Sequence, residues 1–183
     1  MKTAAAEHIF ASSDGTLVTI RALLPSDSLA EITALLHRSY RPLAAAGLNY
    51  SATSQDVETT RGRMKNGICI VGTVDERIIA TLTLYRPGHD ACAWYARPDV
   101  AVFGQFAVDP EFQRKGIGSH LIHLAEQLAP SLGAVELALD TAEDATQLIK
   151  SYEKRGYRFV EFARWQGKTY RSVIMSKSIS TAS

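Results

Sequence analysis

One stretch of the chain, residues 100–119, constrains the fold more than any other. It begins with a run rich in β-branched and aromatic residues from Val100 to Val108, turns at Asp109-Pro110, and passes through a short basic loop that contains Gly116 and Gly118. Apolar residues then recur at helical spacing, at Ile117, Leu121, Leu124, Ala125 and Leu128. The pattern predicts a strand, a loop and a helix in direct succession.

The predicted loop is suited to binding an anion. The first N–H groups of a helix have no intrahelical acceptor, and the helix dipole places partial positive charge beside them. Gly116 and Gly118 allow the backbone to approach a ligand closely, while Arg114 and Lys115 add charge. The sequence therefore indicates a ligand that carries phosphate.

Two familiar phosphate loops do not fit the spacing. The Walker loop requires G-x-x-x-x-G-K-[ST], but Gly118 is followed by Ser119-His120 and not by lysine. The dinucleotide pattern G-x-G-x-x-G places its first glycine directly after the strand, whereas seven residues, Asp109 to Lys115, precede Gly116 here. Leu121 also stands where that pattern needs a third small residue.

The loop Gln113-Arg114-Lys115-Gly116-Ile117-Gly118 resembles the coenzyme A loop of the GNAT superfamily of N-acetyltransferases, whose pattern is Q/R-x-x-G-x-G/A. Residues 151–157, Ser-Tyr-Glu-Lys-Arg-Gly-Tyr, are similar to the second landmark of that family, l-Y-e-k-x-G-F/Y. The two landmarks occur in the family's order and spacing. The resemblance is firm over roughly residues 68–177 and looser before them.

The resemblance implies one α/β domain over residues 1–183. Its mixed sheet of about six to seven strands is expected to be flanked by about four helices and splayed between the fourth and fifth strands, with the pantetheine arm in the gap. Gly104 in the strand before the loop has two interpretations: it marks the bulge that opens the gap, or it makes room for a neighbouring side chain.

The resemblance also assigns roles to individual residues. It places the coenzyme A contacts at Phe106, Ala107, Val108, Gln113, Arg114, Lys115, Gly116, Ile117, Gly118 and Ser119. A backbone N–H near Phe106 would polarise the thioester carbonyl. Tyr152 matches the tyrosine that protonates the departing thiolate, and the alternative is that it only packs against the sheet. Ala145 stands where the family commonly has a pantetheine-binding asparagine, so the resemblance does not carry that contact over: either the helix begins in a different register or backbone groups alone serve there.

The resemblance implies transfer of an acetyl group from acetyl-CoA to a primary amine of a small molecule or peptide, by direct attack in a ternary complex. The alternative function is a catalytically idle acyl-CoA sensor or assembly module. The acceptor segment between Tyr40 and Gly67 contains Tyr40 and Tyr50. They either line the acceptor pocket or are half-buried packing residues whose hydroxyls face solvent. A homodimer is expected from the family alone.

The sequence names no general base. Residues 100–108 contain no Asp or Glu, and the remaining candidates are expected at the solvated surface: Asp56, Glu58, His89 and Asp99. His120 and His123 fall on the helix after the loop and are expected to be structural. Cys92 as an acyl-carrying nucleophile lacks an evident histidine partner.

Composition excludes several classes of protein. In 183 residues, 20 Lys and Arg balance 19 Asp and Glu to a net charge of +1, so no global field favours nucleic acid or a membrane surface. Cys69 and Cys92 are the only cysteines and show no metal-site spacing, so free thiols, no bound metal and a cytoplasmic location are expected. Residues 1–12 and 178–183 are expected to fray.

Patterning predicts most of the remaining elements. A hairpin is expected at Asp14-Gly15, followed by a helix that is capped by Ser28 and Glu31 and ends at Arg41-Pro42, and by a polar helix at 54–65. A second hairpin should join 68–74 to 77–85, and a strand at 134–139 should run parallel to 100–108. The chain should end with a helix that is capped by Thr141 and Asp144 and stops at Gly156, and with a hairpin of 157–162 and 169–177.

Overall fold

The strand predicted at residues 100–108 forms and lies inside a single sheet. The computed structural model describes residues 7–89 and 91–179, and within them the chain forms eight strands and four α-helices. The strands are β1 (His8–Ala11), β2 (Leu17–Ala22), β3 (Gly67–Val74), β4 (Arg77–Tyr85), β5 (Val100–Val108), β6 (Glu136–Ala142), β7 (Arg158–Ala163) and β8 (Ser172–Ser178). The helices are α1 (Leu29–Ala45), α2 (Val57–Met64), α3 (Ile117–Leu128) and α4 (Thr146–Glu153), and short 3₁₀ turns cover Ser51–Thr53, Pro110–Phe112 and Ala129–Leu132.

The strands join in the order β1-β2-β3-β4-β5-β6-β8-β7. Neighbouring strands are antiparallel except for β5 and β6, which run parallel because α3 crosses between them. This confirms the mixed α/β sheet and the parallel pair. The sheet has eight strands where about six to seven were expected, since the hairpin at Asp14-Gly15 adds β1 as a full strand at one edge.

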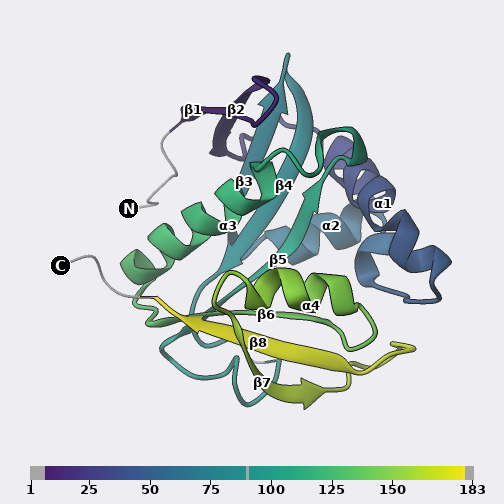
Figure 1. Cartoon of the computed structure of the whole chain (residues 1–183), viewed down its shortest axis with the longest axis vertical. Coiled ribbons are helices and arrows are strands. Elements are labelled where there is room, and N and C mark those ends of the chain that lie inside the picture. The colour runs from purple at the N-terminus through teal and green to yellow at the C-terminus, as the bar shows by residue number, and fades with distance from the viewer. Residues whose placement is uncertain (1–6, 90, 180–183) are drawn as a thin grey trace.

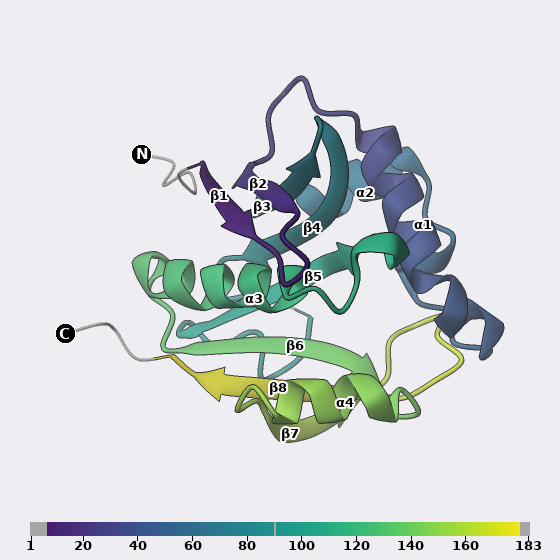
Figure 2. The ribbon, with the colours of Figure 1, turned by 45° about the horizontal axis from the view of Figure 1, so that its top comes forward.

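The helices cover both faces of the sheet (Figures 1 and 2). On one face α1 and α2 bury residues such as Ile32, Leu35 and Met64 against β3 and β4. On the other face α3 packs Leu121 and Ala125 into the main core, and α4 contributes partly buried side chains to the same cluster. The apolar stripe predicted along α3 therefore faces the sheet as its spacing requires.

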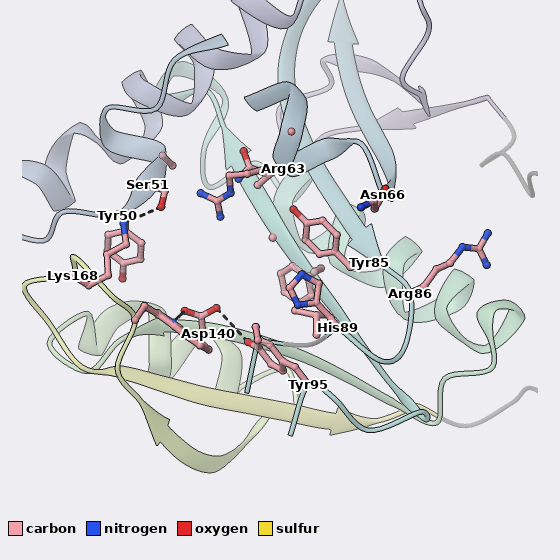
Figure 3. A pocket seen from close by; sticks show the side chains of 18 of the residues that line it. Tyr50, Ser51, Arg63, Asn66, Tyr85, Arg86, His89, Tyr95, Asp140 and Lys168 are labelled. Atoms are coloured by element: carbon pink, nitrogen blue, oxygen red, sulfur yellow. Dashed lines mark hydrogen bonds between the residues drawn. The ribbon is translucent and has the colours of Figure 1, made fainter. Parts of the chain in front are cut away.

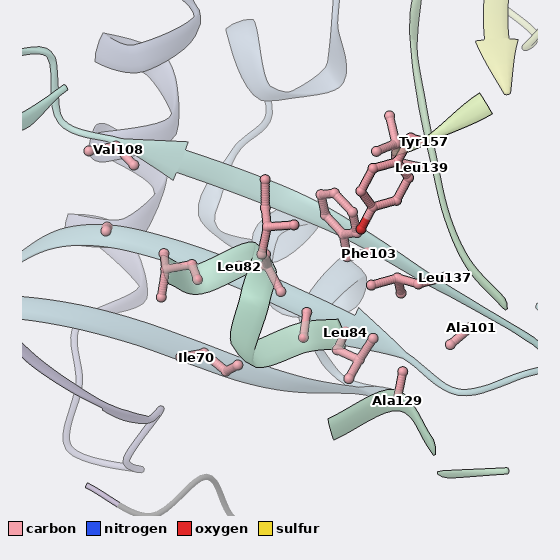
Figure 4. Close-up of a cluster of buried hydrophobic side chains, with 14 of the residues drawn as sticks. Ile70, Leu82, Leu84, Ala101, Phe103, Val108, Ala129, Leu137, Leu139 and Tyr157 are labelled. Atoms are coloured by element: carbon pink, nitrogen blue, oxygen red, sulfur yellow. The ribbon is translucent and has the colours of Figure 1, made fainter. Parts of the chain in front are cut away.

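The main core lies between α3 and the middle strands. Its members come from most of the sheet and include Ile70, Leu82, Leu84, Ala101, Phe103, Leu137, Leu139 and Tyr157, which Figure 4 shows side by side. Full burial of each Leu, Ile or Phe side chain among them is worth about 1.5–3 kcal/mol. This packing holds β5 and the start of α3 in a fixed relation, which positions the loop between them.

Helix α1 starts as predicted but continues further. Ser28 caps it by accepting a hydrogen bond from the Glu31 N–H at 3.2 Å. The Glu31 carboxylate does not complete the capping box, because it accepts from the Ile78 N–H at 2.8 Å instead. The expected end at Arg41-Pro42 is wrong: Pro42 lies inside the helix, which runs to Ala45. Proline lacks only its own N–H, so packing of the flanking turns can carry a helix past it.

Helix α4 has a different cap from the predicted one. Thr141 is still part of β6, and Ala145 is the N-cap residue, which offers no side-chain acceptor. A turn in which the Ala145 N–H donates to Ala142 O at 3.0 Å begins the helix instead. Gly156, with φ of 87°, ends the segment in the left-handed conformation as predicted.

The three predicted hairpins all form. The β1–β2, β3–β4 and β7–β8 pairs are antiparallel, and Asp75 and Glu76 turn between β3 and β4 with positive φ. Of the ends expected to fray, His8–Ala11 is a strand and β8 reaches Ser178, while residues 1–6 and 180–183 lie outside the described residues. Cys69 and Cys92 are free thiols. In the described part of the chain no helix is long and apolar enough to cross a bilayer.

Candidate active site

Strands β5 and β6 pair only at their first residues and then separate. The pairs are Val100 with Glu136, Ala101 with Leu137 and Val102 with Ala138. Beyond them β5 carries an extra residue relative to β4, because Thr81 lies opposite Ala107 and Thr83 lies opposite Gly104. The sheet is therefore splayed between the loop-bearing strand and its parallel neighbour, as the resemblance implied.

The bulge is centred on Gln105 and not on Gly104. Gln105 has a φ of 47°, which an L-residue rarely adopts, and it is buried. A Cβ on Gly104 would lie 3.3 Å from Cε2 of Tyr85, so the glycine gives room to that ring and lies beside the bulge. Both interpretations of Gly104 thus describe part of the local structure.

The backbone of β5 turns one edge towards the gap. The Asp109 N–H donates to Ile79 O of β4 at 2.8 Å, so by strand alternation Phe106 and Val108 face the other edge. Among the described residues no strand pairs with them there. The Val108 carbonyl instead accepts from Gln113 Nε2 at 3.0 Å, a bond that ties the basic loop back to the strand.

The loop between β5 and α3 presents unpaired N–H groups. Arg114 has a φ of 62° and Gly116, the N-cap of α3, a φ of 87°. Within the described residues, no backbone N–H from Arg114 to Ser119 donates to another backbone group, and the first such donor is His120, to Gly116 O at 3.0 Å. A helix N-terminus preceded by left-handed residues is a cradle for an anion. The predicted loop residues are brought together here.

Neighbouring elements brace this loop. Asp14, in the turn between β1 and β2, contacts Lys115 Nζ at 2.8 Å, and the Ser13 N–H donates to Lys115 O at 3.1 Å. Arg155, after α4, donates to Ser119 Oγ at 2.6 Å. Segments from both ends of the chain therefore set the shape of the anion cradle.

Tyr152 lies on α4 among aromatic rings. Its ring is edge-on to those of Phe103 and Tyr157, with centroids 6.3 and 6.0 Å away. Burial, followed by the nearby phenols of Tyr40 and Tyr50, raises the pKa of Tyr152 well above its usual range. The phenol is therefore protonated at neutral pH, and within the described residues its hydroxyl has no recorded hydrogen-bond partner.

Tyr40 and Tyr50 bind the two splayed strands. The Tyr40 hydroxyl donates to Phe106 O of β5 at 3.0 Å, while the Tyr50 hydroxyl contacts Thr141 Oγ1 of β6 and accepts from the Ala142 N–H, both at 2.8 Å. Both tyrosines also line a cavity. Both tyrosines therefore line the pocket and also pack against the strands. Their hydroxyls bond to protein groups and not only to solvent.

The cavity beside the gap has a volume of about 810 Å³ (Figure 3). Its walls come from α2, β4, β5, β6 and the loops that follow β4 and β7. The residues that matter below are Arg63, Tyr85, Tyr95, Asp140, Trp165 and Lys168. A cavity of this size fits a small molecule and touches the residues at the splay, including Phe103 and Gly104.

Several of these wall residues were missed from the sequence. Asp140 is a charged residue in the middle of a strand of mostly buried residues, a signal that could have found it. Arg63 lies in a polar helix and Lys168 in a loop, where nothing distinguishes them from solvated residues. In the sequence Tyr85 is only the last residue of a predicted strand, although burial in the structure raises its pKa to about 12.

Other candidates from the sequence lie elsewhere or have structural contacts. Asp56 caps α2 through the Thr59 N–H at 2.7 Å, Glu58 pairs with Arg61, and Asp99 pairs with Arg97 at 2.7 Å. His120 stacks on Phe10 and contacts His8 at 2.8 Å, and Cys92 packs beside Tyr95. His89 alone of the base candidates lines the cavity. In the described part of the chain, no cluster of three or more His, Cys, Asp or Glu could hold a metal.

Comparison with known proteins identifies the family of this chain. Residues 29–157 match the model of the acetyltransferase (GNAT) family. The chain belongs to the GNAT family. Over 134 residues, 72% of this chain and 78% of the relative, it is 33% identical to the S-(2-succino)cysteine N-acetyltransferase of Bacillus subtilis (strain 168).

Solved GNAT structures share this fold. The GNAT domain of PAT from S. lividans aligns with a TM-score of 0.71 at 18% identity over 94% of this chain and 96% of that domain. A GNAT acetyltransferase from Elizabethkingia anophelis with acetyl-CoA bound aligns with a TM-score of 0.65 at 17% identity, over 88% of this chain and 97% of the other. The fold, the family and the acyltransferase class are therefore established for this chain.

Proposed function

We propose that this GNAT enzyme transfers the acetyl group of acetyl-CoA to a primary amine of a small molecule, by direct attack in a ternary complex. The observation that carries the proposal is the gap between β5 and β6, which has an anion cradle at one end, the cavity at the other and Tyr152 beside it. A donor with a phosphorylated head and a thin acyl arm, and an acceptor in the cavity, could then meet at the gap.

The residues present fit coenzyme A. The unpaired N–H groups from Arg114 to Ser119 suit its pyrophosphate, and the N–H groups of Phe106 and Val108 suit its amide-bearing arm. The carbonyls of these two strand residues already accept hydrogen bonds from Tyr40 and Gln113. We assign these contacts to Phe106, Ala107, Val108 and the loop from Gln113 to Ser119. When bound, this group supplies an acetyl thioester. Ala145 provides no side-chain amide, so the arm would depend on backbone groups at that point.

The chain's own residues would act as follows. The acceptor attacks as the neutral amine, so an ammonium group first gives one proton to solvent. Its nitrogen then bonds to the acetyl carbon as the carbon–sulfur bond breaks, and the nitrogen loses a second proton to solvent. A backbone N–H facing the gap at Phe106 stabilises the negative charge that develops on the acetyl oxygen. Tyr152 is protonated at neutral pH, donates a proton to the departing thiolate and regains one from solvent.

The acceptor is a small molecule in this proposal. The Bacillus subtilis relative acts, by its name, on a substituted cysteine, and the cavity of about 810 Å³ suits a molecule of that class. The two free thiols and the use of acetyl-CoA agree with a reducing cytoplasm as the working compartment.

The test is release of CoA thiol from acetyl-CoA with a panel of amines: amino acids and cysteine thioethers, a polyamine and a lysine peptide. Tyr152→Phe should lower kcat about 100-fold or more for any accepted amine, since general acids contribute about 10²- to 10⁴-fold. The KM for acetyl-CoA should stay within about twofold. Unchanged kcat in the Phe variant would remove Tyr152 from the mechanism, and an enzyme that binds acetyl-CoA but turns over no amine would favour the sensor alternative.

A further inference from the structure

Two positively charged side chains share one wall of the cavity without a carboxylate partner. Arg63, on α2, donates from Nη1 to Gln55 Oε1 at 3.1 Å and from Nε to the side-chain oxygen of Gln105 at 2.6 Å, and within the described residues no acidic group lies at salt-bridge distance from it. Lys168 donates from Nζ to Asn49 O and to Ser51 Oγ, each at 2.9 Å, and likewise has no acidic partner there. Ammonium groups have three donors, so one remains on Lys168.

These two cations influence one another. Burial, followed by the charge of Arg63, lowers the pKa of Lys168. Figure 3 shows the Arg63 guanidinium projecting into the cavity on the side of Ser51 and Lys168. Lys168 is half-buried and Arg63 is exposed, and both line the same cavity, so a bound anion would relieve the repulsion between their charges. The wall therefore has the character of an anion site.

The same cavity carries a carboxylate, Asp140, whose charge partly offsets the lowering of the Lys168 pKa. Asp140 Oδ2 accepts from Trp165 Nε1 at 2.9 Å and from Ser172 Oγ at 3.1 Å, and Oδ1 accepts from the Tyr95 hydroxyl at 3.2 Å. No cation in the described part of the chain forms an ion pair with it. An ionised carboxylate offers about four acceptor positions, so about one remains, on Oδ1.

Asp140 is also close to the place of reaction. It is the second residue of β6 after Ala138, the last one that pairs with β5, so its side chain stands at the start of the gap. Its bonds to Tyr95 and Trp165 fix its orientation. A positively charged nitrogen bound to Oδ1 would therefore be held at the edge of the gap, facing the thioester.

We propose that the acceptor is an α-amino acid with at least one additional carboxylate, whose carboxylates bind Arg63 and Lys168 and whose amine binds Asp140. This inference rests on the proposed function. Arg86 at the rim adds a third cation, so the lining holds more cations than carboxylates and matches an acceptor of net negative charge. A polyamine or lysine peptide would bring its second positive charge to Arg63 and Lys168.

The first experiment compares acceptors that differ only in charge. Glutamate is compared with glutamine, and S-carboxymethylcysteine with its side-chain amide, by thiol release and by calorimetric binding to the protein saturated with CoA. A lost charged hydrogen bond lowers affinity about 10- to 100-fold, so the amides should have KM and Kd values raised by that factor. Equal values for acid and amide would overturn the inference.

The second experiment changes the protein. Arg63→Met and Asp140→Asn should raise KM and Kd for the dicarboxylic acceptor about 10-fold or more, with KM for acetyl-CoA unchanged. Arg61→Met is the matched control, because Arg61 lies on the same helix, is more than half exposed and pairs only with Glu58. Lys168→Met removes the second cation, and its melting temperature is measured because Lys168 also ties Asn49 to Ser51.

The outcomes separate the inference from the proposed function. Thiol release with a polyamine, and none with carboxylated amino acids, keeps the function and rejects the inference. Calorimetric binding of the dicarboxylic amino acid that is lost in Arg63→Met supports the inference even if no turnover is seen, in which case the transfer reaction is rejected. Equal binding to Arg63→Met and to Arg61→Met rejects the inference in every case.

Discussion

Asp109 holds the strand and the anion loop in register through three elements. Its carboxylate is 2% exposed and lies 2.8 Å from Nη2 of Arg38 and also of Arg77, while Oδ1 accepts from the Glu111 N–H. Burial acts to raise the pKa of Asp109, but the bonds from Arg38 and Glu111 outweigh it, and the pKa is lowered overall. The ionised form is therefore the one that the fold favours.

The lowered pKa predicts an acid-dependent loss of stability. In the unfolded chain Asp109 has a pKa of about 3.9, so it binds a proton more readily there than in the folded protein. The stabilisation by Asp109 is therefore complete above that pH. It is lost as the pH falls through the lower pKa of the folded state. Asp109→Asn should lower the free energy of unfolding at pH 6 by about 1–3 kcal/mol, measured by urea denaturation. Its free energy of unfolding should also decline less steeply below pH 4 than that of the parent protein. A decline equal to that of the parent protein would contradict this role.

At the scale of elements, the distance between α3 and β5 depends on one glycine. A Cβ built on Gly118 would lie 3.1 Å from Cζ of Phe106, so any side chain there must push the helix or the ring aside. Gly62 in α2 provides the contrast, since nothing lies within 4 Å of its added Cβ and its φ is ordinary. The same substitution should therefore have opposite effects at the two positions.

We predict that Gly62→Ala raises the free energy of unfolding by about 0.5–1 kcal/mol, the usual difference in helix propensity. Gly118→Ala should lower it by about 1 kcal/mol, because overpacking outweighs that gain. Urea denaturation of the two variants beside the parent protein measures both. If Gly118→Ala is as stabilising as Gly62→Ala, the contact between α3 and Phe106 is not tight.

At the scale of the whole molecule, a ligand that binds only the folded state must stabilise it. Acetyl-CoA or CoA at about 100 times its dissociation constant should add about 2.7 kcal/mol of apparent stability, seen as a raised melting temperature. NAD and ATP should have no such effect, and Gly118→Trp should abolish the shift by filling the anion cradle. A shift with NAD or ATP alone would contradict coenzyme A as the ligand of this loop.

Sequence patterning is sufficient for the local structure of this molecule but not for its site. The β5–loop–α3 unit, the hairpins and the Ser28 cap are determined by neighbouring residues, so they could be predicted. Arg38 and Arg77 lie 71 and 32 positions from Asp109, and Lys168 is 117 positions from Ser51, so no local pattern reveals these contacts. Pro42 shows the converse, because tertiary packing keeps a helix that the local signal ends.

The short pairing of β5 with β6 implies a conflict between robustness and activity. If β5 and β6 were paired along their full length, the sheet would gain further backbone hydrogen bonds. Selection for thermal stability alone would therefore favour sequences that close the gap. Such a protein would be more durable but would have no place for its substrate. The incomplete pairing of β5 with β6 thus lowers stability and is kept only by selection for turnover. Variants evolved for heat tolerance without an activity screen should lose this gap first.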